Sequence, residues 1–265
     1  MDEELIKSAV KEILESKYAI ALTGAGLSTE SGIPDYRGPN GIWTKNPEAE
    51  KMAYRSYKLF AENPQRYWEE RLGQTALLGD LSIYSPNQGH YALVELEKLH
   101  KLKHIITQNI DSLHLKSGAI NLIEYHGNAL KLRCLSCSKR YQPGEYDLPK
   151  MHQEKTLPPF CKRCGSPLKS DVVHFGEPIP EDVIYNSIKE AQRCDLMLIC
   201  GTSAAVYPFA SLPVEARKRS GVKIIEVNAA PTPLTTEKIS DYLIQGKTGT
   251  ILPRIAELVD QKMEA

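Results

Sequence analysis

The stretch Tyr18-Ala-Ile-Ala-Leu-Thr-Gly-Ala-Gly26 indicates the fold, because it joins a short apolar strand directly to a glycine-rich turn. The turn continues through Leu27, Ser28 and Thr29. Glycines at such a place let the backbone bend tightly and bring its N–H groups up to a pyrophosphate. Taken alone the turn is a weak indication, since a purely structural strand-to-helix turn has the same composition.

Two features of the dinucleotide fingerprint of dehydrogenases are missing here. Thr29 stands where a third glycine is expected, and residues 41–50 contain no second strand that ends in an acidic residue. The chain instead continues as a polar loop, Ser31–Gly38, which contains Asp35 and Arg37. Long polar loops over a nucleotide site are usually functional, and a mere connection does not need these two charged side chains.

Helices and strands alternate along most of the chain. Strands are predicted at 18–22, 103–107, 121–125, 195–200, 222–227 and 242–245, and helices at 2–16, 88–100, 181–193, 208–219 and 250–263. This order predicts an α/β fold, a Rossmann-like doubly wound parallel sheet, with a helical insertion over about 40–85. Ligands bind such sheets at the carboxyl ends of the strands.

The alternation stops between residues 129 and 171, where four of the six cysteines form two CxxC pairs: Cys134, Cys137, Cys161 and Cys164. In a reducing compartment, paired CxxC motifs favour metal over disulfides. Four thiolates complete a tetrahedral zinc site and leave no position for water or substrate, so one structural zinc is expected. A redox dithiol is the alternative, and two pairs in one short insertion disfavour it.

The domain organisation follows from this interruption. Residues 1–128 and 172–265 are expected to form the nucleotide-binding Rossmann-like domain, and residues 129–171 a small zinc-binding module inserted in it. Cys194 and Cys200 flank an apolar run, and we expect both to be small core residues.

Composition and charge limit the classes of partner. The 265 residues include 33 Lys and Arg against 33 Asp and Glu, and this zero net charge argues against direct nucleic-acid binding. The acidic start Met1-Asp-Glu-Glu4 does not resemble a signal or transit peptide. No apolar run is long enough to span a bilayer. We expect a cytoplasmic protein without a membrane partner.

Several motifs together resemble those of the sirtuin family. The loop Gly24–Gly38 resembles its cofactor loop, with Tyr36 where the family usually has Phe, and Thr107-Gln-Asn-Ile-Asp-Ser-Leu-His114 resembles its second signature. Tyr125-His126-Gly127, Gly201-Thr202-Ser203 and Val227-Asn228 match further family segments in the same order, as does Val172-Val-His-Phe-Gly-Glu-Pro178. The similarity runs from about residue 18 to the C-terminus.

This resemblance implies an NAD-dependent protein lysine deacylase, most simply a deacetylase, that moves the acyl group to ADP-ribose and releases nicotinamide. Its partner would be an acylated-lysine protein or peptide, bound at Val172, Val173, His174, Phe175, Gly176 and Glu177. The implied NAD contacts are Gly24, Ala25, Gly26, Ser28, Thr29, Pro34, Asp35, Tyr36, Arg37, Trp43, Gln108, Asn109, Ile110, Asp111, His126, Gly201, Thr202, Ser203, Val206, Asn228, Ala229, Lys247 and Thr248.

Three polar residues are the candidates for catalysis. A departing nicotinamide leaves positive charge on the ribose, and Asn109 and Asp111 can supply acceptor groups beside it. His126 follows a predicted strand and titrates near neutrality, so it is the candidate base for a ribose hydroxyl. His114 is interpreted as a packing residue, and the other histidines are expected at surface or satisfied core positions.

The acyl group is the least defined part of the prediction. Sirtuins that remove succinyl or malonyl groups carry a Tyr-x-x-Arg pair, and an ungapped match puts Arg71 and Gln74 at these places. Arg66 and Arg71 are expected on a solvated helix face with Glu69 and Glu70. An uncharged acyl group is therefore favoured. Two alternatives remain open: a protein mono-ADP-ribosyltransferase and an NAD-sensing module with little turnover.

Overall fold

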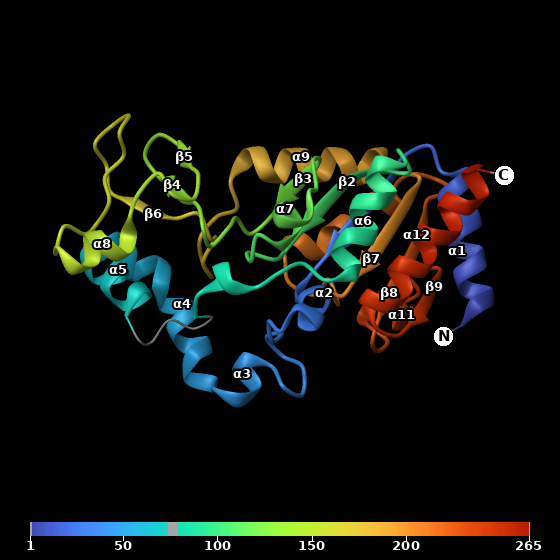
Figure 1. The fold of residues 1–265 in the computed structure, drawn as a ribbon, viewed down its shortest axis with the longest axis horizontal. Helices are drawn as coiled ribbons and strands as arrows, with labels where there is room; N and C mark the ends of the chain where they lie inside the picture. Colours follow the sequence, from blue (N-terminus) through green and yellow to red (C-terminus); the bar gives the residue numbers. More distant parts are fainter. Residues whose placement is uncertain (1, 74–78, 265) are drawn as a thin grey trace.

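A six-stranded sheet forms the centre of the larger part of the molecule in the computed structural model, which describes residues 2–73 and 79–264 (Figure 1). All neighbouring strands are parallel, and their spatial order is β3-β2-β1-β7-β8-β9. The strands are β1 (Ala19–Thr23), β2 (Leu102–Thr107), β3 (Leu122–Glu124), β7 (Leu196–Cys200), β8 (Lys223–Asn228) and β9 (Tyr242–Gln245). The predicted doubly wound sheet is confirmed.

Helices cover both faces of this sheet. One face carries α1 (Glu3–Glu15), α6 (Gln88–Lys98) and α12 (Thr248–Glu264), and the other carries α9 (Glu181–Arg193) and α10 (Leu212–Arg217). The sheet and these five helices are called the sheet lobe below. The predicted helix 208–219 is shorter, because η3 (Phe209–Ser211) precedes α10. The other short elements are α2 (Ala25–Ser28), η1 (Thr29–Ser31), η2 (Leu81–Ile83), α7 (Leu113–Ser117) and α11 (Pro233–Thr236).

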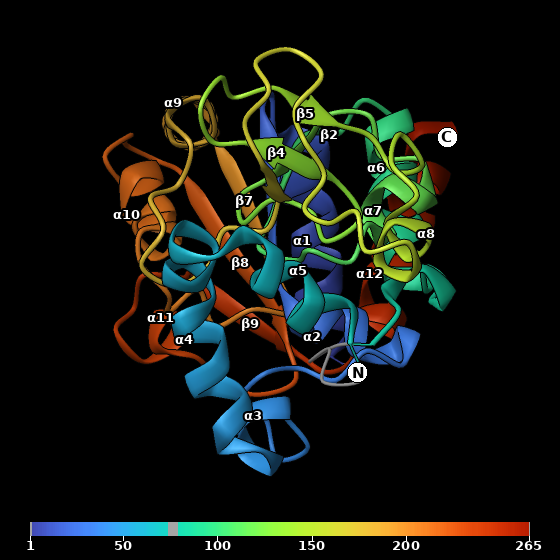
Figure 2. The same ribbon diagram turned by 90° about the vertical axis from the view of Figure 1, so that its left-hand side faces the viewer.

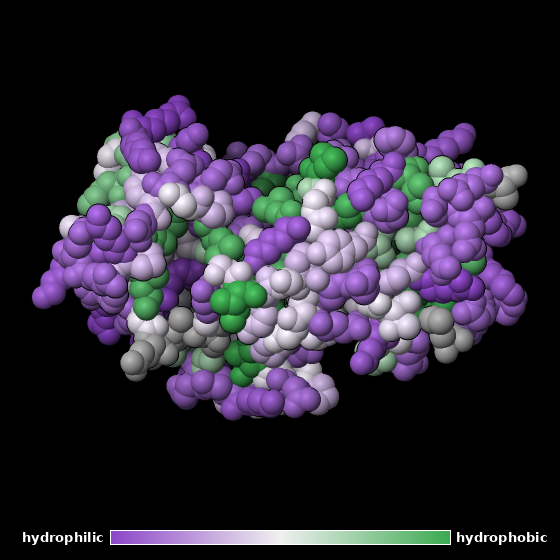
Figure 3. Space-filling view, viewed as in Figure 1, coloured by the Kyte–Doolittle hydropathy of each residue, from purple (hydrophilic) through white to green (hydrophobic). Residues whose placement is uncertain are grey.

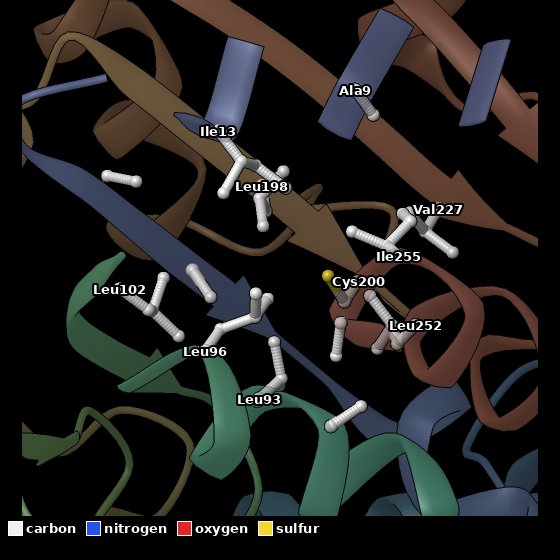
Figure 4. Close-up of a cluster of buried hydrophobic side chains, with 14 of the residues drawn as sticks. Ala9, Ile13, Leu93, Leu96, Leu102, Leu198, Cys200, Val227, Leu252 and Ile255 are labelled. Carbon is white, nitrogen blue, oxygen red and sulfur yellow. The ribbon is translucent and has the colours of Figure 1, made fainter. Parts of the chain in front are cut away.

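Helix α1 shows how local sequence determines an element and its burial. The Asp2 side chain caps the helix by accepting a hydrogen bond from the Leu5 amide at 3.2 Å. Apolar residues at helical spacing, which include Ala9 and Ile13, form the buried face. Figure 4 shows both pointing toward Leu198 and Val227 of the sheet, with side chains of α6 and α12 beside them.

A second, smaller lobe combines the two insertions. It contains α3 (Ile42–Lys45), α4 (Pro47–Glu62), α5 (Pro64–Leu72), α8 (Leu148–Gln153) and an antiparallel sheet of β5 (Arg140–Tyr141), β4 (Leu132–Cys134) and β6 (Leu168–Ser170). Figures 1 and 2 show α4, α5, α8 and the small sheet grouped at one end of the molecule, with α3 below them. Asn46 and Asn63 cap α4 and α5, and each helix begins with a proline.

One hydrophobic core joins the helical insertion to the cysteine-rich segment. Phe60, Tyr67 and Trp68 of the helices pack with Leu132 and Leu168 of the small sheet. The indole N–H of Trp68 donates to the Leu168 carbonyl at 2.8 Å. The two segments, expected separately from the sequence, therefore fold as one body, which is called the small lobe below.

None of the helices in the described part of the chain combines the length and apolar character needed to cross a bilayer.

Candidate active site

A cleft of about 2360 Å³ lies along the carboxyl ends of the strands and between the two lobes. Figure 3 shows the surface hollowed at this boundary, with hydrophobic residues along it. All six residues expected at the peptide line the cleft. The residues expected at NAD that line it are Ala25, Gly26, Thr29, Asp35, Tyr36, Arg37, Trp43, Gln108, Asn109, Ile110, His126, Gly201, Thr202, Ser203, Val206, Asn228, Ala229, Lys247 and Thr248.

Four residues expected at NAD are not part of this lining. Gly24 and Ser28 contact the lining residue Asn109, and Asp111 contacts Ser28, whereas Pro34 is exposed on the loop.

The glycine turn lies against the turn that follows β7. The Gly26 amide donates to the Gly201 carbonyl at 2.8 Å. Gly201 has a φ of +63°, and a Cβ there would lie 2.2 Å from the Leu27 nitrogen. A Cβ on Gly26 would lie 2.7 Å from the Gly201 oxygen. These glycines are therefore needed for the close approach of two strand ends, which brings Ala25 and Gly26 to the lining of the cleft.

Asn109 and Asp111 are held by the glycine turn. The Asn109 side-chain amide donates to the Gly24 carbonyl at 2.9 Å and to the Ser28 hydroxyl oxygen at 3.1 Å. The Ser28 hydroxyl in turn donates to Asp111 Oδ2 at 2.7 Å, and the Leu113 amide donates to Oδ1 at 2.8 Å. Burial raises the pKa of Asp111, and the two donors partly oppose this shift. Ser28 thus connects both candidate residues to the glycine turn, which is called the cofactor turn below.

His126 follows β3 at the edge of the cleft. Its Nδ1 lies 3.2 Å from the Gln108 carbonyl, which can only accept, so Nδ1 carries the proton in the neutral ring. The lone pair is then on Nε2. Phe209 and Tyr125 pack near the ring, with centroids 6.3 and 5.4 Å away. The geometry therefore fixes the tautomer that a general base needs.

The pH dependence of activity follows from this environment. Burial lowers the pKa of His126 below its ordinary 6.5, and the Gln108 hydrogen bond opposes the shift. A base acts in its neutral form, so activity is retained above the lowered pKa and is lost as pH falls through it. We expect the acid limb of kcat/KM to have its midpoint below pH 6.5. A midpoint near pH 7 or higher would contradict this environment.

Residues Val172–Glu177, which are expected to bind the peptide and are called the peptide segment below, lie next to the end of β3 that leads to His126. The Val173 amide donates to the His126 carbonyl at 2.8 Å. Gly127 has a φ of +73°, and a Cβ there would meet the Asp171 oxygen at 1.9 Å. Only glycine permits this contact, so the segment and the candidate base are held at a fixed distance.

Aromatic residues form the wall of the cleft on the side of the small lobe. Trp43 is buried, with its ring centroid 4.8 Å from Tyr36 and 5.4 Å from Phe175. The Arg37 guanidinium stacks 4.5 Å from the Trp43 ring centroid. Tyr54, which the sequence analysis missed, stacks on Phe175 at 4.4 Å. The cofactor loop and the peptide segment thus meet through packed aromatic rings.

A hydrogen-bond network orders the side of the cleft at β7 and β8. The Thr202 amide donates to Asn228 Oδ1 at 2.9 Å, and the Gln108 amide group donates to the Thr202 hydroxyl oxygen at 2.7 Å. Sequence reasoning missed Glu226, a fully buried residue that accepts a hydrogen bond from Asn228 at 3.1 Å. Its carboxylate also accepts from the hydroxyls of Thr232, Thr235 and Ser240.

The four predicted zinc ligands lie together. Their sulfur atoms are all within 4.8 Å of one another, with Cys134 and Cys164 at 3.4 Å and Cys137 and Cys161 at 3.7 Å. Tetrahedral Zn–S bonds of about 2.3 Å place sulfur atoms about 3.8 Å apart. None of these cysteines forms a disulfide. The donor set fits one structural zinc.

The lone cysteines and the histidine pair are core features. Cys194 and Cys200 are buried, and burial raises the pKa of each thiol to about 12, as expected for inert core residues. His114 is buried 2.9 Å from the Thr23 hydroxyl, below the cofactor turn. His90 packs on it with ring centroids 5.0 Å apart, so it is a core residue.

The position of Arg71 differs from the sequence expectation. Arg66 forms the expected surface ion pair with Glu70 at 3.0 Å. Arg71 instead lines the cleft, half-buried, and its guanidinium donates to the Ala129 carbonyl at 3.4 Å. The solvated-face interpretation is therefore wrong for Arg71, because α5 turns that side toward the cleft. Gln74 lies outside the described residues.

Comparison with known proteins agrees with this arrangement. A profile described as the Sir2 family matches residues 24–208. The chain is 41% identical to "NAD-dependent protein deacylase 2" of Archaeoglobus fulgidus, over 97% of both chains.

Two solved structures are similar over nearly the whole chain. One is a histidine variant of a Sir2 homologue with ADP-ribose, at TM-score 0.81 and 38% identity, covering 100% of this chain and 98% of that one. The other is a Sir2 variant with deacetylated p53 peptide and 3'-O-acetyl-ADP-ribose, at TM-score 0.77 and 31% identity, covering 96% and 98%. On the family match and these identities, the chain belongs to the Sir2 family.

Proposed function

We propose that this protein is an NAD-dependent protein lysine deacylase that transfers the acyl group to ADP-ribose and releases nicotinamide. The name of the Archaeoglobus relative and the ligands of the second solved structure support this activity. One observation carries this proposal: His126 lies between the cofactor turn and the peptide segment. Its Nδ1–H donates a hydrogen bond to the Gln108 carbonyl, which leaves Nε2 free to act as a base. A base at this position is close to the sites proposed for both NAD and the acyl-lysine peptide.

Asn109 and Asp111 are assigned to the cleavage of NAD. Loss of nicotinamide leaves positive charge on the ribose carbon, which acceptor groups in a dry site stabilise. Both donor hydrogens of the Asn109 amide are already used by Gly24 and Ser28. Its Oδ1 accepts no hydrogen bond from the part of the chain that the structure describes, so it is available to the ligand. Asp111 supplies a buried carboxyl on the same loop.

His126 is assigned to acyl transfer. In this reaction the acyl-lysine carbonyl oxygen attacks the ribose carbon and displaces nicotinamide. His126 Nε2 then removes the proton from a ribose hydroxyl, whose oxygen attacks the acyl carbon. The proton leaves with the freed lysine amine, and one water molecule completes the O-acyl-ADP-ribose. The Val173 amide donates a hydrogen bond to the His126 carbonyl, so the peptide segment is held next to the base. Aromatic packing among Tyr36, Trp43 and Phe175 gives the cleft an apolar wall.

Two other functions would use the same NAD site, and one assay distinguishes both of them from deacylation. The protein is incubated with NAD and an acetylated peptide, and nicotinamide and peptide mass are followed together. A deacylase lowers the peptide mass by an acetyl group, and an ADP-ribosyltransferase raises it by an ADP-ribosyl group. An NAD-sensing module changes neither quantity. Either of the last two results would replace the proposed function.

The acyl preference is expected to favour uncharged groups. A buried carboxylate needs a charge-assisted partner, and without one succinyl-lysine is disfavoured by about tenfold. We expect kcat/KM for acetyl-lysine peptides to exceed that for succinyl-lysine peptides, and Arg71→Tyr with Gln74→Arg to shift the ratio toward succinyl. A wild-type preference for succinyl would mean that the ungapped match is wrong and that Arg71, which lines the cleft, or another cation pairs with the acyl carboxylate.

The partner is proposed to be an acylated protein or peptide and not a nucleic acid, since the chain has no net charge with which to attract phosphates. A cytoplasmic location is proposed from the four unpaired thiols of the metal cluster, which a reducing compartment preserves.

A further inference from the structure

We propose that Lys169 is a positioning residue that ties the cysteine-bearing sheet to the peptide segment Val172–Glu177, so that this sheet controls acyl-peptide affinity. The inference rests on the proposed function, because it concerns the same cleft. Lys169 lies in β6, and its side chain is fully buried, an unusual place for an ammonium group. A charge placed there needs partners, and its partners identify its role.

The Lys169 ammonium holds both ends of the peptide segment. It donates to the Ser170 carbonyl at 2.7 Å and to the Val172 carbonyl, where the segment begins. It also lies 3.0 Å from Glu177 Oε2, where the segment ends. The His174 amide donates to the same Glu177 oxygen at 3.0 Å. One ammonium therefore closes the loop that presents residues to the cleft.

The contacts of Lys169 also connect the peptide segment to the metal cluster. Lys169 pairs with Arg133 across the β4–β6 ladder, and the next pair is Cys134 with Leu168. The Arg133 guanidinium contacts the other oxygen of Glu177. Arg133 directly precedes a zinc ligand, so a metal that fixes Cys134 fixes both cations beneath the peptide segment.

Removing Lys169 should loosen the peptide segment more than the NAD site. Glu177 would keep Arg133, but the Val172 carbonyl would lose its charged donor in a buried place. The cofactor turn is held by separate contacts through Asn109 and Ser28. The expected signature is therefore weaker peptide binding with nearly unchanged NAD binding.

The charge of Lys169 gives an independent readout. Burial lowers its pKa to about 8, while Glu177 opposes the shift and Arg133 and Arg71 add to it. His174, on the same loop, is kept neutral because burial lowers its pKa to about 2. Lys169 should then lose its proton in mildly alkaline solution, and peptide affinity should fall with it.

The test measures dissociation constants of the zinc-loaded full chain for an acetyl-lysine peptide and for NAD. Lys169→Met is expected to weaken peptide binding by about tenfold or more. NAD binding should stay within about twofold, with one zinc retained. Lys169→Arg should restore most of the peptide affinity. The exposed Lys150→Met in the same lobe is the matched control and should match wild type.

If Lys169→Met does not fold, the pH dependence of peptide affinity in wild type and in Lys169→Arg tests the proposal instead. Wild-type peptide affinity should fall above about pH 8, and Lys169→Arg should remove this fall because arginine stays charged. Unchanged peptide affinity in Lys169→Met, equal losses of peptide and NAD affinity, or no alkaline difference between wild type and Lys169→Arg would overturn the inference. A wild-type chain that neither binds nor deacetylates the peptide would overturn the proposed function itself.

Discussion

His126→Ala is expected to lower the rate of deacetylation by about a thousandfold, since a positioned general base contributes on this order. The NAD dissociation constant should change by less than about threefold, because the glycine turn is held by contacts of Asn109 and Ser28 that do not involve the imidazole. The ring makes one hydrogen bond, to the Gln108 carbonyl, and the peptide segment bonds to the backbone of His126. Rates with an acetylated peptide and NAD titration by calorimetry measure the two effects.

The matched control for this variant is His152→Ala. His152 is exposed on α8 and outside the cleft lining, so its removal should leave both quantities at wild-type values. Deacetylation by His126→Ala within a few-fold of wild type would show that another group removes the ribose proton.

Cys134→Ser is expected to abolish stoichiometric zinc binding and to lower the unfolding temperature by about 10 °C or more. The physical reason is the small size of the sheet that the cysteines hold, whose strands contain two or three residues each. The core of Trp68, Leu132 and Leu168 depends on that sheet. Metal analysis in reducing buffer and thermal unfolding with and without chelator provide the measurements.

Cys200→Ala serves as the control for the zinc experiment. Cys200 is buried in the sheet lobe, so this variant should keep one zinc per chain and lose only the small packing energy of its thiol. Full stability of Cys134→Ser, or of the wild-type chain after chelation, would mean that the small lobe folds without metal.

The sheet lobe could be predicted from sequence because its information is local. Each strand of the main sheet is a short apolar run next to an amphipathic helix, and the carboxyl ends of parallel strands must meet at one edge. The motifs after β1, β2, β3, β7 and β8 therefore converge on the cleft. The small lobe was less predictable, since strands of two or three residues have no period, and the contact of Trp68 with Leu168 joins segments far apart in the chain.

Buried charges account for what the sequence did not reveal in the site. Lys169 and Glu226 look like ordinary surface residues in a single sequence, yet both are fully buried with several partners. The sequence predicts a solvated face for Arg71, which lines the cleft, because helical periodicity gives the angle of a side chain about its helix but not which neighbour that side meets. Long-range packing decides all three cases.

One cleft is proposed to couple NAD cleavage to acyl transfer, so the release of nicotinamide should depend on the acyl group of the peptide. The wild-type chain is supplied with NAD and either an acetylated peptide or the same peptide without the acetyl group, and nicotinamide and freed lysine are counted in each reaction. This coupling should give one nicotinamide per freed lysine with the acetylated peptide, together with one acetyl-ADP-ribose, and only slow release with the unacetylated peptide. Equal nicotinamide release with both peptides would contradict it.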